Sequence, residues 1–173
     1  LAQLPEPSEI LEALCNHHLL HRGENLALRF AHQRFQEFFC ACVVLERLNR
    51  ALTNNDERRA IQTKILNYPF WEDATGLALS KLAASQNHGT LAEFILELAI
   101  PVDLAYASNL VGLLDSINKS GLNWQTLRGA IEQLHGQTSS EAIQYAMESA
   151  AVTRSSEFAH LLWPLIESDD QQV

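Results

Sequence analysis

The sequence has few of the positive charges that several functional classes require. Lys and Arg together number 12 against 21 Asp and Glu, which gives a formal net charge of −9. Nucleic acids and anionic membrane surfaces are both bound through clustered Lys and Arg, which displace counterions or pair with lipid headgroups. The composition therefore argues against nucleic acid and against a charged membrane as partners.

Long apolar runs are also missing. The longest one, Phe38 to Leu45, covers 8 residues, whereas a helix that spans a membrane needs about 20. No basic segment followed by an apolar stretch opens the chain, so we expect no signal peptide. The chain begins at Leu1 rather than at Met, and we expect it to be part of a longer protein.

Cysteine is scarce, with only Cys15, Cys40 and Cys42. Cys40 and Cys42 lie two residues apart on an expected helix, so their side chains point to opposite sides of it. Three scattered cysteines are typical of reduced, small apolar side chains in a cytosolic protein.

Three histidines, His17, His18 and His21, follow Cys15 closely. A metal site would need them on one face, but the two leucines between them look like strand residues, and no second ligand pair follows at zinc-site spacing. We interpret them as a polar helix end that enters a hairpin, and we expect no metal.

Catalytic and nucleotide-binding motifs are absent as well. The sequence contains no GxxxxGK[ST] phosphate loop, no GxGxxG and no GxSxG. We therefore expect that this chain is not itself an enzyme, holds no cofactor, and neither hydrolyses ATP nor binds it tightly.

What the sequence does contain is mostly helical pattern. Ser8 is a good N-cap for a first helix. A hairpin is predicted next, with a turn at 23–25 and alternating apolar residues from Leu26 to Phe30. A long helix is predicted from His32 to Leu52. Its segment 40–45 is apolar all round, which suggests a central strut covered on several sides.

From Asp56 onward every pattern is helical. Candidate helix starts are 33 or 34 residues apart, at Asp56, Thr90, Asn123 and Ser156. Each interval holds a second helical pattern, at Trp71–Ala84, Asp103–Ile117 and Ser139–Val152. Two helices in a period in the low thirties are typical of an α-solenoid. A HEAT-like stack fits this spacing best, and an irregular helical bundle is the alternative.

The two parts should meet through a shared core. The residues expected to include core positions at this junction are Phe35, Phe38, Leu45, Trp71, Leu77 and Leu79.

The stretch LRFAHQRFQEFFCACVVLERL, from Leu28 to Leu48, resembles the winged-helix module that follows the nucleotide-binding domain of NACHT-type signal-transduction NTPases, in the STAND group of ATPases. The residues that carry the resemblance are Phe30, His32, Phe35, Gln36, Glu37, Phe38, Phe39 and Ala41. The segment YPFWED from Tyr68 is similar to the Trp-led start of the helix after this module.

This resemblance implies a partial winged helix with one β-hairpin at 1–54 and a HEAT-like α-α superhelix at 55–173. The chain would then be a regulatory and protein-binding region in the cytoplasm, joined to an upstream NACHT ATPase core that it restrains while sensing a protein partner. ATP or ADP with Mg²⁺ would be bound by the intact protein, which would oligomerise when activated. His32 would contact the ADP phosphate. The alternative is a free-standing helical-repeat scaffold with no ATPase attached.

Overall fold

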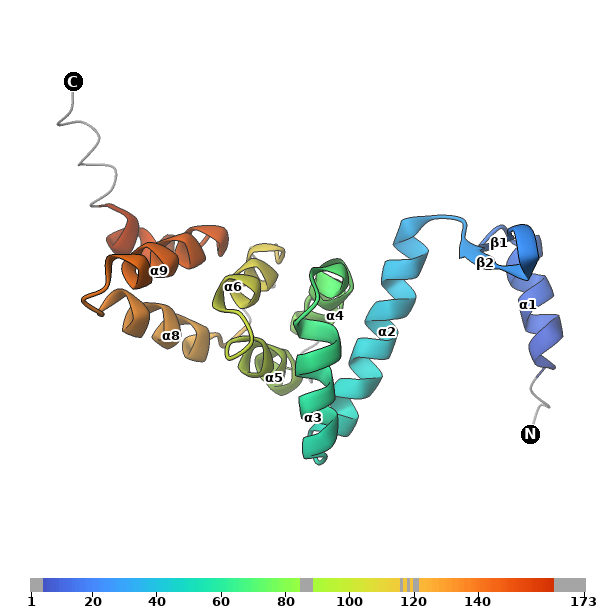
Figure 1. Cartoon of the computed structure of the whole chain (residues 1–173), viewed down its shortest axis with the longest axis horizontal. Helices are drawn as coiled ribbons and strands as arrows, with labels where there is room; N and C mark the ends of the chain where they lie inside the picture. Colours follow the sequence, from blue (N-terminus) through green and yellow to red (C-terminus); the bar gives the residue numbers. More distant parts are fainter. Residues whose placement is uncertain (1–4, 85–88, 116, 118, 120–121, 164–173) are drawn as a thin grey trace, which may run out of the picture.

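A computed structural model describes residues 5–84, 89–115, 117, 119 and 122–163 of the chain. These residues form helices and one antiparallel pair of strands, arranged as an elongated molecule (Figure 1). The predicted fold class, mostly α with one β-hairpin, is confirmed.

The N-terminal arm, residues 5–31, holds a helix and the hairpin. Its elements are α1 (Pro7–Asn16), β1 (Leu20–Arg22), the 3₁₀ turn η1 (Glu24–Leu26) and β2 (Leu28–Phe30). Leu20 pairs with Phe30 and Arg22 with Leu28. Asn25 closes the turn at φ 60°, a left-handed conformation that Asn tolerates well. The predicted hairpin is therefore confirmed.

The start of α1 differs from the prediction. The N-cap is Glu6 rather than Ser8, and the Glu9 carboxylate accepts a hydrogen bond from the Glu6 N–H at 3.1 Å. Pro7 occupies the first helical position, where its fixed φ suits a helix and its missing N–H costs nothing. Proline thus moves the start of the helix ahead of the serine.

Helix α2 (Gln33–Ala51) is the longest in the described chain, with His32 as N-cap and Leu52 as C-cap. The predicted helix is therefore confirmed. Its buried face consists of small and aliphatic residues with helical spacing, namely Ala41, Val44, Leu48 and Ala51. This face packs on α3 (Asn55–Ile61) and on α4 (Glu72–Ala83).

The prediction that the phenylalanines of α2 are core residues is wrong. Phe35 is 38% exposed, Phe38 is 49% exposed, and Val43 is also exposed. The Phe and Ala/Val stripes both follow the helical period, but only the second one faces neighbouring helices. The apolar segment 40–45 is thus covered on one side, not on several.

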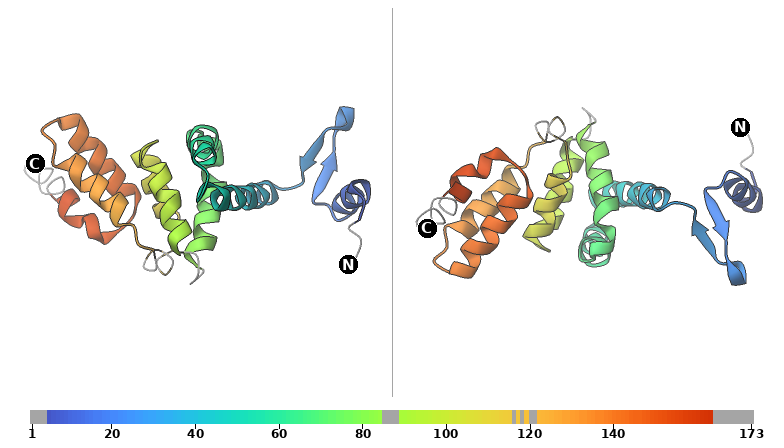
Figure 2. Two further views of the ribbon diagram at one scale, coloured as in Figure 1. Left: turned by 90° about the horizontal axis from the view of Figure 1, so that it is seen from below. Right: turned by 90° about the horizontal axis from the view of Figure 1, so that it is seen from above.

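The rest of the chain forms a helical stack (Figure 2). After α3 come the π-helical turn η2 (Gln62–Leu66), the 3₁₀ turn η3 (Pro69–Trp71), α4, α5 (Gly89–Ala99), α6 (Leu104–Gly112), α8 (Gln125–His135), α9 (Ser140–Val152) and the 3₁₀ turn η4 (Ser156–Phe158). Helices α4, α6 and α9 pack in sequence as one layer, and η2, α5 and α8 form the other. The chain alternates between the two layers from α4 to α9, as a solenoid does.

Two predicted helix starts, Asp103 and Ser139, are the N-caps of α6 and α9, and the predicted start at Asp56 lies two residues after the N-cap of α3, Asn54. All three caps accept hydrogen bonds from the first backbone N–H groups of their helices. One detail was predicted wrongly: helix α6 ends at Gly112 and not at Ile117. The predicted start at Ser156 agrees with the structure, where Ser156 opens the 3₁₀ turn η4 and helical residues 159–163 follow it.

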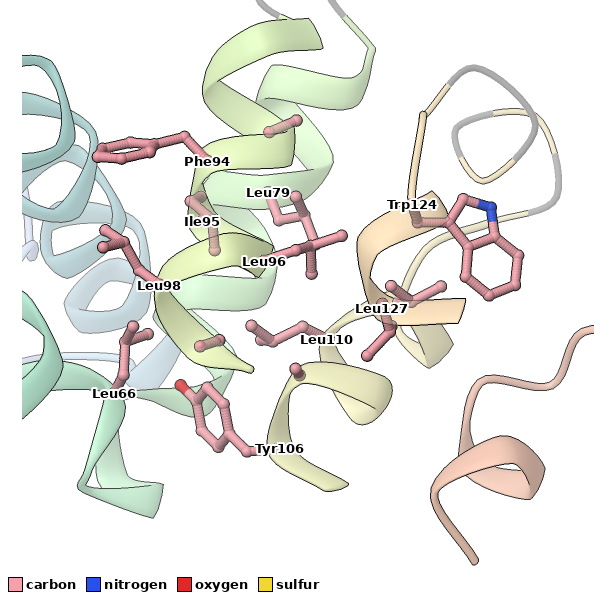
Figure 3. Close-up of a cluster of buried hydrophobic side chains, with 14 of the residues drawn as sticks. Leu66, Leu79, Phe94, Ile95, Leu96, Leu98, Tyr106, Leu110, Trp124 and Leu127 are labelled. Carbon is pink, nitrogen blue, oxygen red and sulfur yellow. The ribbon is translucent and has the colours of Figure 1, made fainter. Parts of the chain in front are cut away.

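One hydrophobic core runs through the stack (Figure 3). It includes the fully buried side chains of Leu79, Leu110 and Leu127. Of the predicted junction residues, Leu79 is buried, Leu45 and Trp71 are partly buried against this core, and Leu77 is exposed. The prediction for Leu77 is wrong because Gly76 and Ala78 on either side of it face the core instead.

Layer α4–α6–α9 packs closely because its contact residues are small. A methyl group on Gly112 would lie 2.1 Å from the Val152 carbonyl oxygen. Polar bonds join the layer at its edge. The Asp103 carboxylate caps α6 and accepts a hydrogen bond from the Tyr145 hydroxyl at 2.8 Å, and the Asn109 amide donates to the Glu72 carboxylate. These bonds fix α6 against both of its neighbours.

Candidate functional site

His32 lies at the end of α2 that is turned away from the stack (Figure 1). Its side chain is exposed, and Nδ1 accepts a hydrogen bond from the Arg34 N–H at 3.2 Å. Because Nδ1 uses its lone pair for this bond, the ring proton must be on Nε2. Nε2–H is therefore the ring's hydrogen-bond donor, on an exposed residue.

Glu37 stabilises the first turns of the same helix. One carboxylate oxygen accepts from the Gln33 amide at 2.7 Å, and the other lies 3.1 Å from an Arg34 guanidinium nitrogen. The Glu37 side chain is only 11% exposed, against 81% for Arg34. Because both oxygens bond to side chains of the same helix, Glu37 stabilises the helix start that carries His32.

A groove of about 580 Å³ lies between the start of α2 and the start of α4. Its lining comes from both segments that carry the family resemblance: Phe30, Gln36 and Glu37 on one wall, Phe70 and Trp71 on the other. These segments are more than 30 residues apart in the sequence. The structure thus brings them together into one surface feature.

Two residues that line this groove, Phe30 and Phe70, are exposed phenylalanines, and further exposed phenylalanines lie on α2. Phe30 stacks on Phe39, and Phe38 meets Phe39 edge-on, each pair with ring centroids 5.6 Å apart. Phe70 contacts Trp71 edge-on and is 72% exposed. We call Phe30, Phe35, Phe38, Phe39 and Phe70 the aromatic face.

A second, apolar pocket of about 330 Å³ continues the aromatic face between α2 and α4. Phe38, Leu45 and Leu77 line it. Phe38 and Leu77, both expected among the core residues of the junction, line this open pocket and not a closed core.

The predicted domain boundary at 54/55 falls between α2 and α3, which pack against each other. The arm lies at the far end of α2, beyond the stack (Figure 1). Its helix α1 has no buried residue, and all three residues of β2 are exposed. The most loosely packed part of the described chain is therefore the arm, not the region next to residue 54.

Within the described residues, no three His, Cys, Asp or Glu side chains are grouped closely enough to hold a metal ion. His17, His18 and His21 are exposed around the turn from α1 to β1. Nor does this part of the chain include a helix with the length and apolar character needed to cross a membrane.

One cluster escaped the sequence analysis. Lys119, Arg128 and Arg154 line a pocket of about 410 Å³ at the start of α8. They are 9 and 26 residues apart and follow no known motif spacing. Only the packing of α8 beside α9 brings them together, so no sequence signal could have identified this pocket.

Comparison of the chain with family models, with curated proteins and with solved structures finds no match in any of the three.

Proposed function

We propose that this chain is the regulatory and protein-interaction region of a NACHT-type NTPase, and that its aromatic face docks on the ATPase core. The observation that carries the proposal is the coincidence of two features. Three of the residues that resemble the family's winged-helix module, Phe30, Gln36 and Glu37, line the groove, and Phe30 also stacks on Phe39 in the row of exposed phenylalanines.

Physical reasoning supports docking at this surface. Contiguous exposed apolar patches on a soluble protein mark contact sites, because their exposure to water is unfavourable. An arm of this size buries too little surface to hold itself together without a partner. A protein surface that covers α1, the hairpin and the first half of α2 would bury these rings and complete the module.

The nucleotide would belong to the core and not to this chain. His32 fits one additional contact, since it is exposed at the start of α2 and its Nδ1 is already bonded, which leaves Nε2–H as the donor. A neutral imidazole donor can hold a phosphate oxygen of ADP without adding a fixed charge. In this proposal the contact favours the resting state of a cytoplasmic switch. Mg²⁺ with ATP or ADP, and oligomerisation, would be properties of the intact protein.

The alternative is a free-standing helical-repeat scaffold. The observation in its favour is the two-layer stack from α4 to α9, whose core is closed without help from the arm. The gene's reading frame before Leu1 separates the two hypotheses. A GxxxxGK[ST] phosphate loop a few hundred residues upstream favours the NACHT proposal, and an upstream frame without one would refute it.

Docking can be tested directly by capture of the upstream ATPase core with this 173-residue chain. We expect Phe38→Asp and Phe70→Asp to reduce capture at least tenfold, since each places a charge in the buried contact. Leu52→Asp is the matched control, because Leu52 is an exposed apolar residue at the opposite end of α2. Equal capture by all three variants would show that the aromatic face is not the contact.

The nucleotide contact is tested in the intact protein by the release of bound ADP. His32→Ala should speed ADP release and raise basal activation, whereas His21→Ala, an exposed histidine on β1, should leave both unchanged. Titration of the 173-residue chain alone with ATP and Mg²⁺ should show no micromolar binding. Unchanged ADP release from the His32 variant would remove that residue from the proposal.

A further inference from the structure

Three basic residues gather at the pocket at the start of α8. Lys119, Arg128 and Arg154 are three of only 12 Lys and Arg residues, and one carboxylate, Glu157, is among the residues that line the pocket with them. The pocket lies at the end of the stack far from the aromatic face (Figure 1). It is therefore independent of the proposed docking surface.

Two of the three cations are not neutralised by acidic side chains. The Arg128 guanidinium bonds the Glu132 carboxylate at 2.9 Å and the Glu157 carboxylate at 3.1 Å. Lys119 donates only to a neutral group, the Thr153 carbonyl, at 2.8 Å. Arg154 forms no ion pair within the described part of the chain. Burial lowers the pKa of Lys119, and the positive charge of Arg154 lowers it further.

The backbone at Arg154 is strained. This residue follows the C-cap of α9 with φ 54°, a left-handed conformation that is unfavourable for a residue with a side chain and that glycine usually fills. Residues held in such conformations cluster at functional sites. Here the strain places a long cationic side chain against the pocket, where glycine would have been more stable.

Neutral donors complete the lining. Ser155 Oγ accepts a hydrogen bond from the Glu157 N–H at 3.3 Å, which leaves its own hydroxyl hydrogen free to donate. The start of α8 lies at the same region and adds the positive end of its helix dipole; the Trp124 side chain makes no capping bond, and the Gln125 N–H donates to Asn123 Oδ1 at 3.3 Å.

From these contacts we propose that the pocket lined by Lys119, Arg154 and Ser155 binds a phosphate group. Two uncompensated cations match the double charge of a phosphate monoester or of free phosphate better than the single charge of a carboxylate. The Glu157 carboxylate limits the affinity because it repels the phosphate, and its bond to the Arg128 guanidinium restrains that side chain.

The test is binding of inorganic phosphate, pyrophosphate and formate to the 173-residue chain at constant ionic strength, followed by calorimetry or NMR shifts. Arg154→Gly removes the cation and relieves the backbone strain, so this variant should fold at least as well as the natural chain. We expect it to weaken phosphate binding about tenfold. His18→Gly is the matched control, because it relieves the same left-handed conformation at φ 56° after α1, outside the pocket, and should leave binding unchanged.

A second variant tests the same electrostatic argument through an expected increase in phosphate affinity. Glu157→Gln removes the repulsive charge and frees one Arg128 nitrogen, so phosphate should bind severalfold more tightly. Phosphorylated serine in a short peptide, compared with free phosphate, shows which source of the group is preferred. Non-saturable binding, equal affinity for formate and phosphate, or binding that is unchanged in both pocket variants would overturn the proposal.

Discussion

The N-terminal arm with the first half of α2, and the helical stack, use the same residue type in opposite ways. Phe158 is fully buried in the stack, where it meets Trp124 edge-on with ring centroids 5.6 Å apart. Phe38 on α2 is half exposed, although it also sits in an aromatic cluster. The difference arises from neighbouring helices and not from residue type: the helices of the stack cover Phe158, whereas no neighbouring helix covers Phe38 within the described residues.

The same substitution in both regions should show the largest contrast. Phe158→Ala should lower the free energy of unfolding by about 3–5 kcal/mol, because it leaves a cavity in a closed core. Phe38→Ala should cost about 1 kcal/mol or less, since much of the ring is already in water. Urea denaturation followed by circular dichroism measures both values, and equal costs would mean that the aromatic face is buried in solution.

Two glycines test how tightly the stack is closed. Gly112→Ala should cost about 1–3 kcal/mol, because the added methyl group would collide with the Val152 carbonyl and force α6 away from α9. Gly129→Ala on α8 meets no atom within 4 Å and should instead stabilise the chain by about 0.5–1 kcal/mol through helix propensity. Thermal melts of the two variants should therefore shift in opposite directions.

Alkaline pH should weaken the stack through Tyr106. Burial raises the pKa of Tyr106 from 10.0 to about 12, with a smaller opposing effect from Thr75. A group with a raised pKa in the folded state contributes fully below its unfolded pKa, and its contribution is lost as pH rises from about 10 to about 12. Unfolding free energy should thus fall by about 1–2 kcal/mol in this window. The fall should be smaller in Tyr106→Phe, and an equal fall in both proteins would assign it to other groups.

The smallest effect is expected at the start of α2. His32→Ala removes the N-cap bond to the Arg34 N–H, which should cost about 1 kcal/mol locally. Amide exchange at residues 33–36 should accelerate severalfold, whereas exchange in α6 and α9 should not change. Acceleration across the whole chain would show that the arm and the stack unfold together.

The sequence predicted the stack better than it predicted burial. Caps such as Asn54, Asp103 and Ser139 identify helix starts because they satisfy backbone groups locally, without reference to the rest of the fold. Burial depends on which side of a helix meets a neighbour. On α2 two stripes shared the helical period, and the more hydrophobic stripe, which includes Phe35 and Phe38, proved to be the exposed one.

The candidate sites also differ in how well the sequence could predict them. His32 could be singled out because its motif is continuous in sequence, and its exposure at the helix start agrees with the expected position, while its contact with ADP stays a prediction. The groove between Phe30 and Phe70 and the pocket around Arg154 depend on contacts between distant segments. Such contacts are set by tertiary packing, which no local pattern of one sequence encodes.

The alternation of helices between two layers also gives the molecule a mechanical property. Within the layer, α4 packs on α6 and α6 packs on α9, so a small rotation at each of these junctions would add up along the long axis (Figure 2). We therefore expect the stack to bend along its length more easily than within one helix pair. The aromatic face and the pocket at the start of α8 lie toward opposite ends of the stack, so bending would change the distance between ligands bound at the two sites.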